Sequence, residues 1–296
     1  MRKEEPAAAP DLTLDAADAY CRFLTEHHYE NFSVASRFID AARRTDLARI
    51  YAYCRSTDDL GDESPEGTAL RRLERWRAEV EGLFASDPPV HPVLVALQRT
   101  IARHRIPAAP FLDLIEANVM DQQMKAYPAW SDLERYCALS AAPVGRMVLR
   151  VFGITDPECE RLSDDVCVGL QLANHAQDAS RDALLGRSYL VQSDVARSGK
   201  VGATRALVDR ARTLLDSGRA LARRVDPVPL RLQVTLYRLG GLAICDAIER
   251  RGYETATHRP SVSSATKAAL VVRAVFEALY PTAARQSGTT TPHPTK

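Results

Sequence analysis

The chain has 296 residues, of which 46% are hydrophobic, and it carries 39 basic against 38 acidic side chains. The hydrophobic fraction excludes disorder of the whole chain. The formal net charge of +1 argues against a nucleic-acid partner and against a strongly charged membrane surface. Any electrostatic function is therefore expected from local clusters of charge.

Cysteine usage and the N-terminal residues indicate the compartment. The six cysteines contain no C-x-x-C pair and no paired histidine spacing, which argues against structural zinc and a disulfide framework. They are typical of small core residues in a reducing compartment. The first residues, MRKEEPAAAPD, lack the apolar region of a secretory signal, and no window approaches about eighteen uncharged apolar residues. We expect a cytoplasmic protein without a spanning helix, for which peripheral contact with the inner membrane face stays open.

Helical periodicity dominates the chain between two small, polar or Ala/Pro-rich ends. Residues 1–11 and 285–296 are predicted to be disordered tails. In chain order, the segments 14–27, 70–85, 92–104, 206–225 and 231–251 repeat apolar residues with a period of about 3.6. No alternating strand pattern competes with them. The pattern predicts one all-α domain over residues 12–284, with roughly a dozen helices.

Local signals predict where some helices begin and end. Ser64 followed by Pro65 is typical of a helix start, and Ser131 with Glu134 is typical of a capping box. Gly199 and Gly202 are predicted to close a short helix that follows Ser193.

The segment YCRSTDDLGDESPEG, residues 53–67, places four acids within six positions at the end of a helix-like run. Asp58 and Asp62 share a helix face, and like charges at this spacing destabilise a helix by roughly 0.2–0.5 kcal/mol per pair. Acids near a helix C-terminus also oppose the macrodipole. Either these acids form a solvated helix end, or they bind a cation, and the motif alone does not decide between the two.

A second polar row occurs in GLQLANHAQDASRDALLGRSYL, residues 169–190. Gln171, Asn174, Asp178 and Asp182 follow steps of three, four and four, so they fall within an arc of roughly 80° on one helix. The neighbouring residues are too apolar or too small for a fully exposed helix. Carboxylates on a face that points partly inward need a cation.

Two carboxylate clusters supply the hard oxygen ligands that Mg²⁺ prefers, usually together with waters and substrate phosphates. The EF-hand spacing is absent, and no Glu-x-x-His pair lies near either cluster. A diphosphate bound to Mg²⁺ also needs positive charge. Tyr51 and Arg55 form a row with Asp59, although Arg55 is equally typical of an ion pair within its helix. Arg187 follows the second cluster, either as a diphosphate contact or as a surface charge.

The segments FSVASRFIDAARRTDLARIYAYCRSTDDLGDE and QLANHAQDASRDALLGRSYL, with YC…PVG between them, resemble the squalene/phytoene synthase family. The resemblance covers about residues 14–280. It implies an all-α isoprenoid-synthase fold, in which both acid motifs face each other across a central cavity and hold Mg²⁺ with a prenyl diphosphate. HHYENFSVAS and ANHAQDASRD look most like the hydroxysqualene synthases of bacterial hopanoid pathways, the HpnC type. In that branch presqualene diphosphate becomes hydroxysqualene, with water capturing the cation.

Site residues carry over from this resemblance by position. The implied metal ligands are Asp58, Asp59 and Asp62 in the first motif and Asn174, Asp178 and Asp182 in the second. The implied substrate contacts are Ser33, Tyr51, Arg55, Gln171 and Arg187, with Tyr136 as a wall residue.

Ala142, Ala126 and Val191 stand where relatives usually have Asn, Arg and Pro, and these departures leave the exact substrate and product open. One alternative is head-to-head condensation of prenyl diphosphates, starting from farnesyl diphosphate and giving presqualene diphosphate, squalene or a phytoene-type product. An alternative of another class is a non-catalytic helical assembly factor. The resemblance also implies hand-over partners, a presqualene diphosphate synthase upstream and a squalene-forming oxidoreductase downstream.

Overall fold

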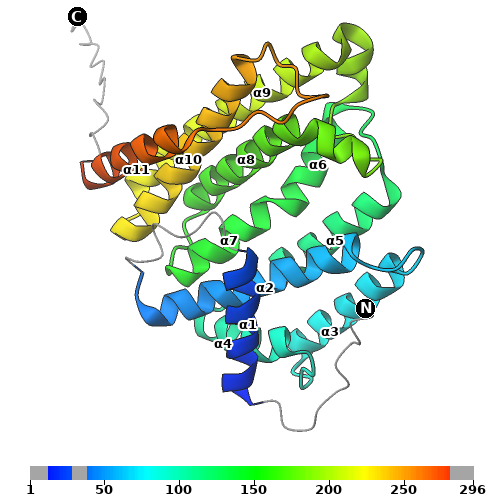
Figure 1. Cartoon of the computed structure of the whole chain (residues 1–296). Helices are drawn as coiled ribbons and strands as arrows, with labels where there is room; N and C mark the ends of the chain where they lie inside the picture. The colour runs from blue at the N-terminus through cyan, green and yellow to red at the C-terminus, as the bar shows by residue number, and fades with distance from the viewer. Residues whose placement is uncertain (1–12, 29–38, 281–296) are drawn as a thin grey trace, which may run out of the picture.

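The computed structural model describes residues 13–28 and 39–280. These residues form eleven α-helices and no β-strand, which confirms the all-α prediction (Figure 1). In chain order the helices are α1 (Leu14–His28), α2 (Ala41–Asp62), α3 (Ala69–Ala85), α4 (Pro92–His104), α5 (Ala109–Gln123), α6 (Trp130–Ser140), α7 (Ala142–Val151), α8 (Pro157–Leu184), α9 (Gln192–Arg224), α10 (Val228–Glu249) and α11 (Ser264–Leu279).

Two large hydrophobic cores organise the helices. The first lies among α1 to α5 and α7, where Tyr53 stacks on Trp76, packs edge-on against Phe111 and donates its hydroxyl to the Phe111 carbonyl over 2.8 Å. The second lies among α5, α6 and α8 to α10, around Leu172 and a group of tyrosines. α2 belongs to the first core and α8 to the second, and both helices end on the same side of the molecule (Figure 1).

The α7–α8 contact explains why a glycine follows Pro143-Val144. A Cβ atom on Gly145 would lie 2.4 Å from Ser163 Oγ and 2.7 Å from Cys167 Sγ. Because real Cβ atoms do not approach other atoms so closely, a larger residue at position 145 would force the Ser163 and Cys167 side chains to shift.

The structure corrects several predicted helix ends. α3 begins at Ala69 and not after Ser64-Pro65, and Ser64 Oγ instead donates to the Leu60 carbonyl over 2.6 Å, which satisfies the end of α2. The N-cap of α6 is Ala129, whose N–H donates to the Asp132 carboxylate over 3.0 Å, so the predicted Ser131–Glu134 capping box is wrong. Gly199 does interrupt the helix, with a φ of 67°, but α9 continues through Gly202.

A buried carboxylate connects α1, α2 and α4. Asp46 has no exposed surface, and Arg49, which it contacts, also binds Asp18 of α1 through two hydrogen bonds of 2.7 and 2.8 Å. Burial alone would raise the pKa of Asp46, but hydrogen bonds and nearby positive charge hold this pKa below its ordinary value. The groups that contact its carboxylate are Thr100 Oγ1 at 2.8 Å, His104 Nε2 at 2.8 Å, Arg103 Nη1 at 3.0 Å and Arg49 Nη1 at 3.1 Å.

All six cysteines are free, four of them buried and two half-buried. Among the helices that the structure describes, none combines the length and the apolar character needed to cross a bilayer.

Candidate functional site

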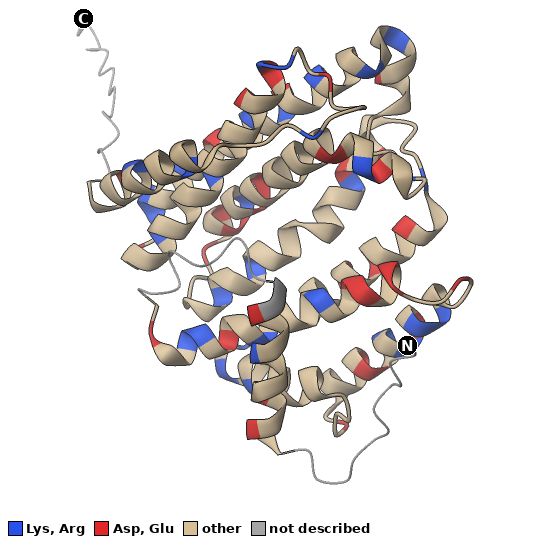
Figure 2. Ribbon diagram, viewed as in Figure 1, with Lys and Arg blue, Asp and Glu red and all other residues tan. Residues whose placement is uncertain are grey.

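The first acid motif occupies the last turn of α2. Asp58, Asp59 and Asp62 all lie within the helix, which ends at Asp62. Arg55 Nη2 is 2.5 Å from Asp59 Oδ1 and 2.8 Å from Glu63 Oε1, so the ion pair within the helix forms. This pair offsets part of the repulsion among the acids and places a positive charge beside them. Acidic residues are drawn in red in Figure 2.

Helix α5 approaches this turn at a glycine. Asn118 Nδ2 donates to Asp58 Oδ1 over 3.2 Å, and Gln122 Nε2 donates to the Gly61 carbonyl over 3.0 Å. A Cβ atom on Gly61 would lie 2.4 Å from Asn118 Oδ1. Sequence reasoning missed Asn118 and Gln122, whose spacing of four residues on α5 was the available signal.

Replacing Gly61 by Ala should displace the Asn118 amide from Asp58. We expect Gly61→Ala to lower kcat/KM by about tenfold, because a hydrogen bond to a charged group is lost. The added methyl group should lower the free energy of unfolding by about 1–3 kcal/mol. Steady-state kinetics and urea unfolding measure the two effects. Asn118→Ala removes the same bond without the steric clash, so full activity in both variants would show that the contact is unimportant.

The second acid motif lies on α8, as the spacing predicted. Asn174 is exposed, whereas Asp178 and Asp182 are half-buried. Gln171 Nε2 lies 3.1 Å from His175 Nε2. Burial lowers the pKa of His175 to about 3, so its ring is neutral at physiological pH.

The carboxylate of Asp182 is poorly satisfied. Its Oδ2 is buried and has no hydrogen-bond partner. Burial, followed by the charges of Asp178 and Asp121, raises the pKa of Asp182 to about 6, against the opposing effect of Arg187. An orphaned buried carboxylate oxygen of this kind is costly unless a cation or donor completes it.

Arg187 brings the two motifs together. Its Nη1 is 2.8 Å from Asp62 Oδ1 and 3.8 Å from Asp121 Oδ2, and its side chain is only 13% exposed. Because the Arg187 backbone N–H also donates to the Asp182 carbonyl over 2.9 Å, the end of α2 and the end of α8 meet at Arg187. Arg187 is therefore not a free surface charge.

Arg259, which sequence reasoning missed, also contacts the second motif. It comes from the segment between α10 and α11, and its Nε donates to Asp178 Oδ1. Its Nη2 donates to Asp178 Oδ2 over 3.3 Å and to Gln177 Oε1 over 3.0 Å. Gln177 Nε2 in turn donates to the Pro260 carbonyl over 2.7 Å, which fixes the segment on α8.

The other predicted site residues lie in different surroundings. Tyr51 is half-buried one turn before Arg55, and burial raises its pKa. Tyr136 is buried and donates its hydroxyl to Asp121 Oδ2 over 2.9 Å. Ser33 lies outside the described residues.

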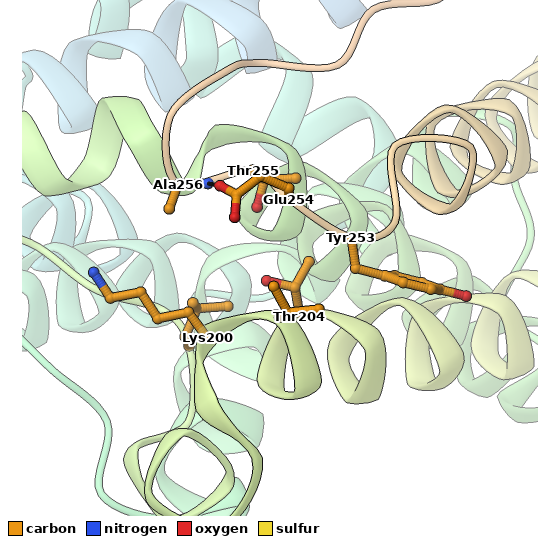
Figure 3. Close-up of a pocket in the computed structure, with 8 residues that line it drawn as sticks. Lys200, Thr204, Tyr253, Glu254, Thr255 and Ala256 are labelled. Atoms are coloured by element: carbon orange, nitrogen blue, oxygen red, sulfur yellow. Dashed lines mark hydrogen bonds between the residues drawn. The ribbon is translucent and has the colours of Figure 1, made fainter.

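A small pocket lies elsewhere, between α9 and the segment before α11. Figure 3 shows Lys200 and Thr204 of α9 opposite residues Tyr253 to Ala256. The Arg205 guanidinium carbon lies over the Tyr253 ring, 4.6 Å from the ring centroid. None of the acid-motif residues lines this pocket.

The raised pKa values predict a pH dependence of stability. Asp58 is exposed in the structure. Desolvation by the protein atoms near its carboxyl group nevertheless raises its pKa to about 6, the same value as for Asp182. A carboxyl whose pKa is higher in the folded state stabilises the fold when protonated, and this contribution is lost as pH rises from about 4 to 6. Asp182→Asn mimics the protonated form. In urea unfolding without metal, the wild-type chain should therefore become less stable than Asp182→Asn as pH rises through this window; parallel profiles would contradict the raised pKa.

A family model of squalene/phytoene synthase matches residues 25–266. The chain belongs to the squalene/phytoene synthase family. A phytoene synthase from Arthrospira platensis is 30% identical over 279 residues, which cover 83% of this chain and 89% of the relative. A hydroxysqualene synthase from Rhodopseudomonas palustris is 34% identical over 222 residues, which cover 72% of this chain and 74% of the relative.

Solved structures agree with this assignment. The crystal structure of squalene synthase HpnC from Alicyclobacillus acidocaldarius is 43% identical, with a TM-score of 0.76 over 82% of this chain and 97% of that one. A dehydrosqualene synthase, 22% identical, has a TM-score of 0.77 over 88% and 96% of the two chains and shows the same fold. The predicted isoprenoid-synthase fold is confirmed. Because squalene/phytoene synthases transfer prenyl groups, this chain is an enzyme of that class, similar to hydroxysqualene synthases.

The residues that depart from the pattern of the squalene/phytoene synthase family have defined places. Ala126 pairs with Ser188 in an isolated parallel bridge, which joins the segment after α5 to the segment after α8. Ala142 is buried at the start of α7, and Val191 is buried directly before α9. None of the three belongs to the acid motifs.

The carboxylate oxygens of the acid motifs are suitable ligands for Mg²⁺ when a substrate supplies the remaining ligands. Within the described residues, no group of three or more His, Cys, Asp or Glu side chains lies close enough to hold a metal by itself. Mg²⁺ bound through substrate phosphates needs only one or two carboxylates, with waters and phosphate oxygens completing the shell. The unpaired Asp182 oxygen fits this requirement.

Proposed function

We propose that this enzyme converts presqualene diphosphate to hydroxysqualene, with water capturing the carbocation left after loss of diphosphate. The observation that carries the proposal is the meeting of both acid motifs at Arg187, whose side chain contacts Asp62 and whose backbone N–H donates to the Asp182 carbonyl. The 43% identity to squalene synthase HpnC and the 34% identity to a hydroxysqualene synthase support this branch of the family.

Asp58, Asp59 and Asp62 on α2, with Asn174, Asp178 and Asp182 on α8, would hold the metal ion. Bound Mg²⁺ would neutralise the diphosphate and so make it a better leaving group. This assignment agrees with the orphaned Asp182 oxygen and with the raised pKa values of Asp58 and Asp182, because a nearby cation favours ionised carboxylates.

The chain's own cations would bind the diphosphate oxygens. Arg55, Arg187 and Arg259 each contact an acid of the two motifs, so they stand at the site before a ligand arrives. Negative charge develops on the diphosphate as the bond to carbon breaks, and fixed guanidinium groups stabilise it without reorganisation. The substrate contacts of Tyr51 and Gln171 are proposed from their place on the same two helices, and that of Ser33 from the sequence resemblance alone.

A neutral, aromatic cluster lies next to Asp121, on α6, α8 and the segment after α8. His175 is neutral, and its ring stacks on Tyr189 with centroids 3.7 Å apart. Tyr136 and Tyr189 are buried. Aromatic faces stabilise nearby positive charge, and burial limits access of bulk water, so rearrangement of the cation can precede its capture.

A second candidate is head-to-head condensation of two prenyl diphosphates, which the 30% identity to a phytoene synthase favours. Incubation of the purified chain with Mg²⁺ and either farnesyl diphosphate or presqualene diphosphate separates the two. We expect consumption of presqualene diphosphate, formation of hydroxysqualene by mass spectrometry, and loss of both with EDTA. Consumption of farnesyl diphosphate alone would make the condensation reaction the correct one. Consumption of neither would favour the assembly-factor interpretation.

A further inference from the structure

A buried carboxylate lies beside the acid motifs without belonging to them. Asp121 of α5 is only 7% exposed and accepts hydrogen bonds from three tyrosine hydroxyls. Tyr136 of α6 and Tyr189 after α8 donate to Oδ2 over 2.9 and 2.8 Å, and Tyr127 after α5 donates to Oδ1 over 3.2 Å. The three rings pack on one another with centroids 5.4–5.5 Å apart. These contacts fix the position of the carboxylate, and together with Arg187 they oppose the rise in its pKa that burial causes.

The same carboxylate faces Arg187. Arg187 Nη1 lies 3.8 Å from Asp121 Oδ2 and 2.8 Å from Asp62 Oδ1. Opposite charges that are largely shielded from bulk water are screened less than those at a surface. Arg187 therefore has one carboxylate partner in the first acid motif and one in the interior. When a metal-bound diphosphate occupies the motif, Asp121 is the carboxylate that remains beside the guanidinium.

The hydrogen bonds that the three tyrosine hydroxyls donate to residue 121 do not by themselves require a charged acceptor. An asparagine in place of Asp121 would offer one acceptor oxygen and would direct an N–H₂ group toward the hydroxyls or toward Arg187. A carboxylate instead accepts from all three hydroxyls and keeps a negative charge near the guanidinium. The neighbouring positive charge thus accounts for an acid at this position.

We propose that Asp121 is a positioning residue for Arg187: held by three tyrosine hydroxyls, it fixes a negative charge that keeps the guanidinium oriented toward a bound diphosphate. The inference rests on the proposed function. Without this charge, Arg187 retains only the acids of the metal motifs as partners and competes with Mg²⁺ for them. Loss of the Asp121 charge therefore weakens binding of the magnesium diphosphate through Arg187, and not through a lost contact to the ligand.

A double-mutant cycle tests whether Asp121 acts through Arg187. The full chain is titrated calorimetrically with inorganic pyrophosphate in the presence of Mg²⁺, for the wild type, Asp121→Asn, Arg187→Gln and the double variant. We expect Asp121→Asn to weaken binding by about tenfold, which corresponds to about 1.4 kcal/mol. In the Arg187→Gln background the same change should weaken it by less than about twofold, whereas two independent effects would add.

Control variants separate positioning from general damage. Asp164→Asn removes a carboxylate that binds the Arg146 guanidinium where α7 packs on α8. Asp164 lies about 27 Å along α8 from Asp182, at 1.5 Å per residue. This variant should therefore bind pyrophosphate as the wild type does. Circular dichroism confirms that each variant is folded. If Asp121→Asn does not fold, Tyr136→Phe combined with Tyr189→Phe removes the two hydroxyls that orient Oδ2, and its cycle with Arg187→Gln is interpreted in the same way.

Wild-type affinity in Asp121→Asn would overturn the proposal, as would additive losses in the cycle. Failure of the wild-type chain to bind magnesium pyrophosphate at all is a different result. It would overturn the proposed function, and this inference with it.

Discussion

Turnover of the prenyl diphosphate falls by about a thousandfold or more, roughly 4 kcal/mol of transition-state stabilisation, when Asp178 or Asp58 is replaced by Ala. Each change removes a proposed metal ligand from one of the two motifs. The fold should survive. Asp58→Ala relieves repulsion among like charges, and Asp178→Ala loses a partly exposed ion pair with Arg259, worth about 0–1 kcal/mol.

Kinetics with saturating Mg²⁺, together with thermal unfolding, measure both expectations. Asp165→Ala is a suitable control, because this acid lies earlier on the same helix and binds Arg161 and Ser217 away from the motifs. It should retain activity within about threefold of the wild type, as expected for a surface change. Normal turnover in both Asp58→Ala and Asp178→Ala would remove the basis for a metal site at these acids.

The largest effect on stability is expected at Asp46, remote from the site. Asp46→Ala leaves the buried Arg49 without one of its carboxylate partners, and breaking a buried charge network costs about 3–5 kcal/mol. For a chain of this size the melting temperature should fall by roughly 10 °C. Urea unfolding and calorimetry measure the change.

Asp40 provides the matched control for Asp46. It begins the same helix and pairs with Arg43, but both side chains are largely exposed. Asp40→Ala should cost only about 1 kcal/mol, the usual contribution of a helix cap. Equal losses at the two positions would show that burial of the Asp46 network does not carry the stability assigned to it.

Periodicity and spacing were enough to predict an all-α fold, several of its helices and the two rows of acids. Each acid motif lies within a single helix, DDLGD in α2 and the row of Asn174, Asp178 and Asp182 in α8. The geometry of one helix determines which of its residues share a face, whatever the rest of the fold. The row from Arg55 to Asp59 was predictable for the same reason, and the ion pair between them forms.

Contacts between segments far apart in the chain were not predictable. Asp121 and Tyr189 are separated by 68 positions and Asp178 and Arg259 by 81, and no local pattern relates such pairs. The buried role of Asp121 depends on packing, which single-sequence reasoning does not supply. The predicted start of a helix after Ser64-Pro65 was wrong for a related reason, since the Ser64 hydroxyl binds the end of the preceding helix instead.

The origin of the product oxygen shows whether water captures the cation in the active site. The purified chain is incubated with Mg²⁺ and presqualene diphosphate in water enriched in ¹⁸O, and the product is analysed by mass spectrometry. We expect hydroxysqualene that carries one ¹⁸O atom, since the oxygen comes from water that captures the cation. Hydroxysqualene without the label, or a product mixture that contains no alcohol, would contradict it.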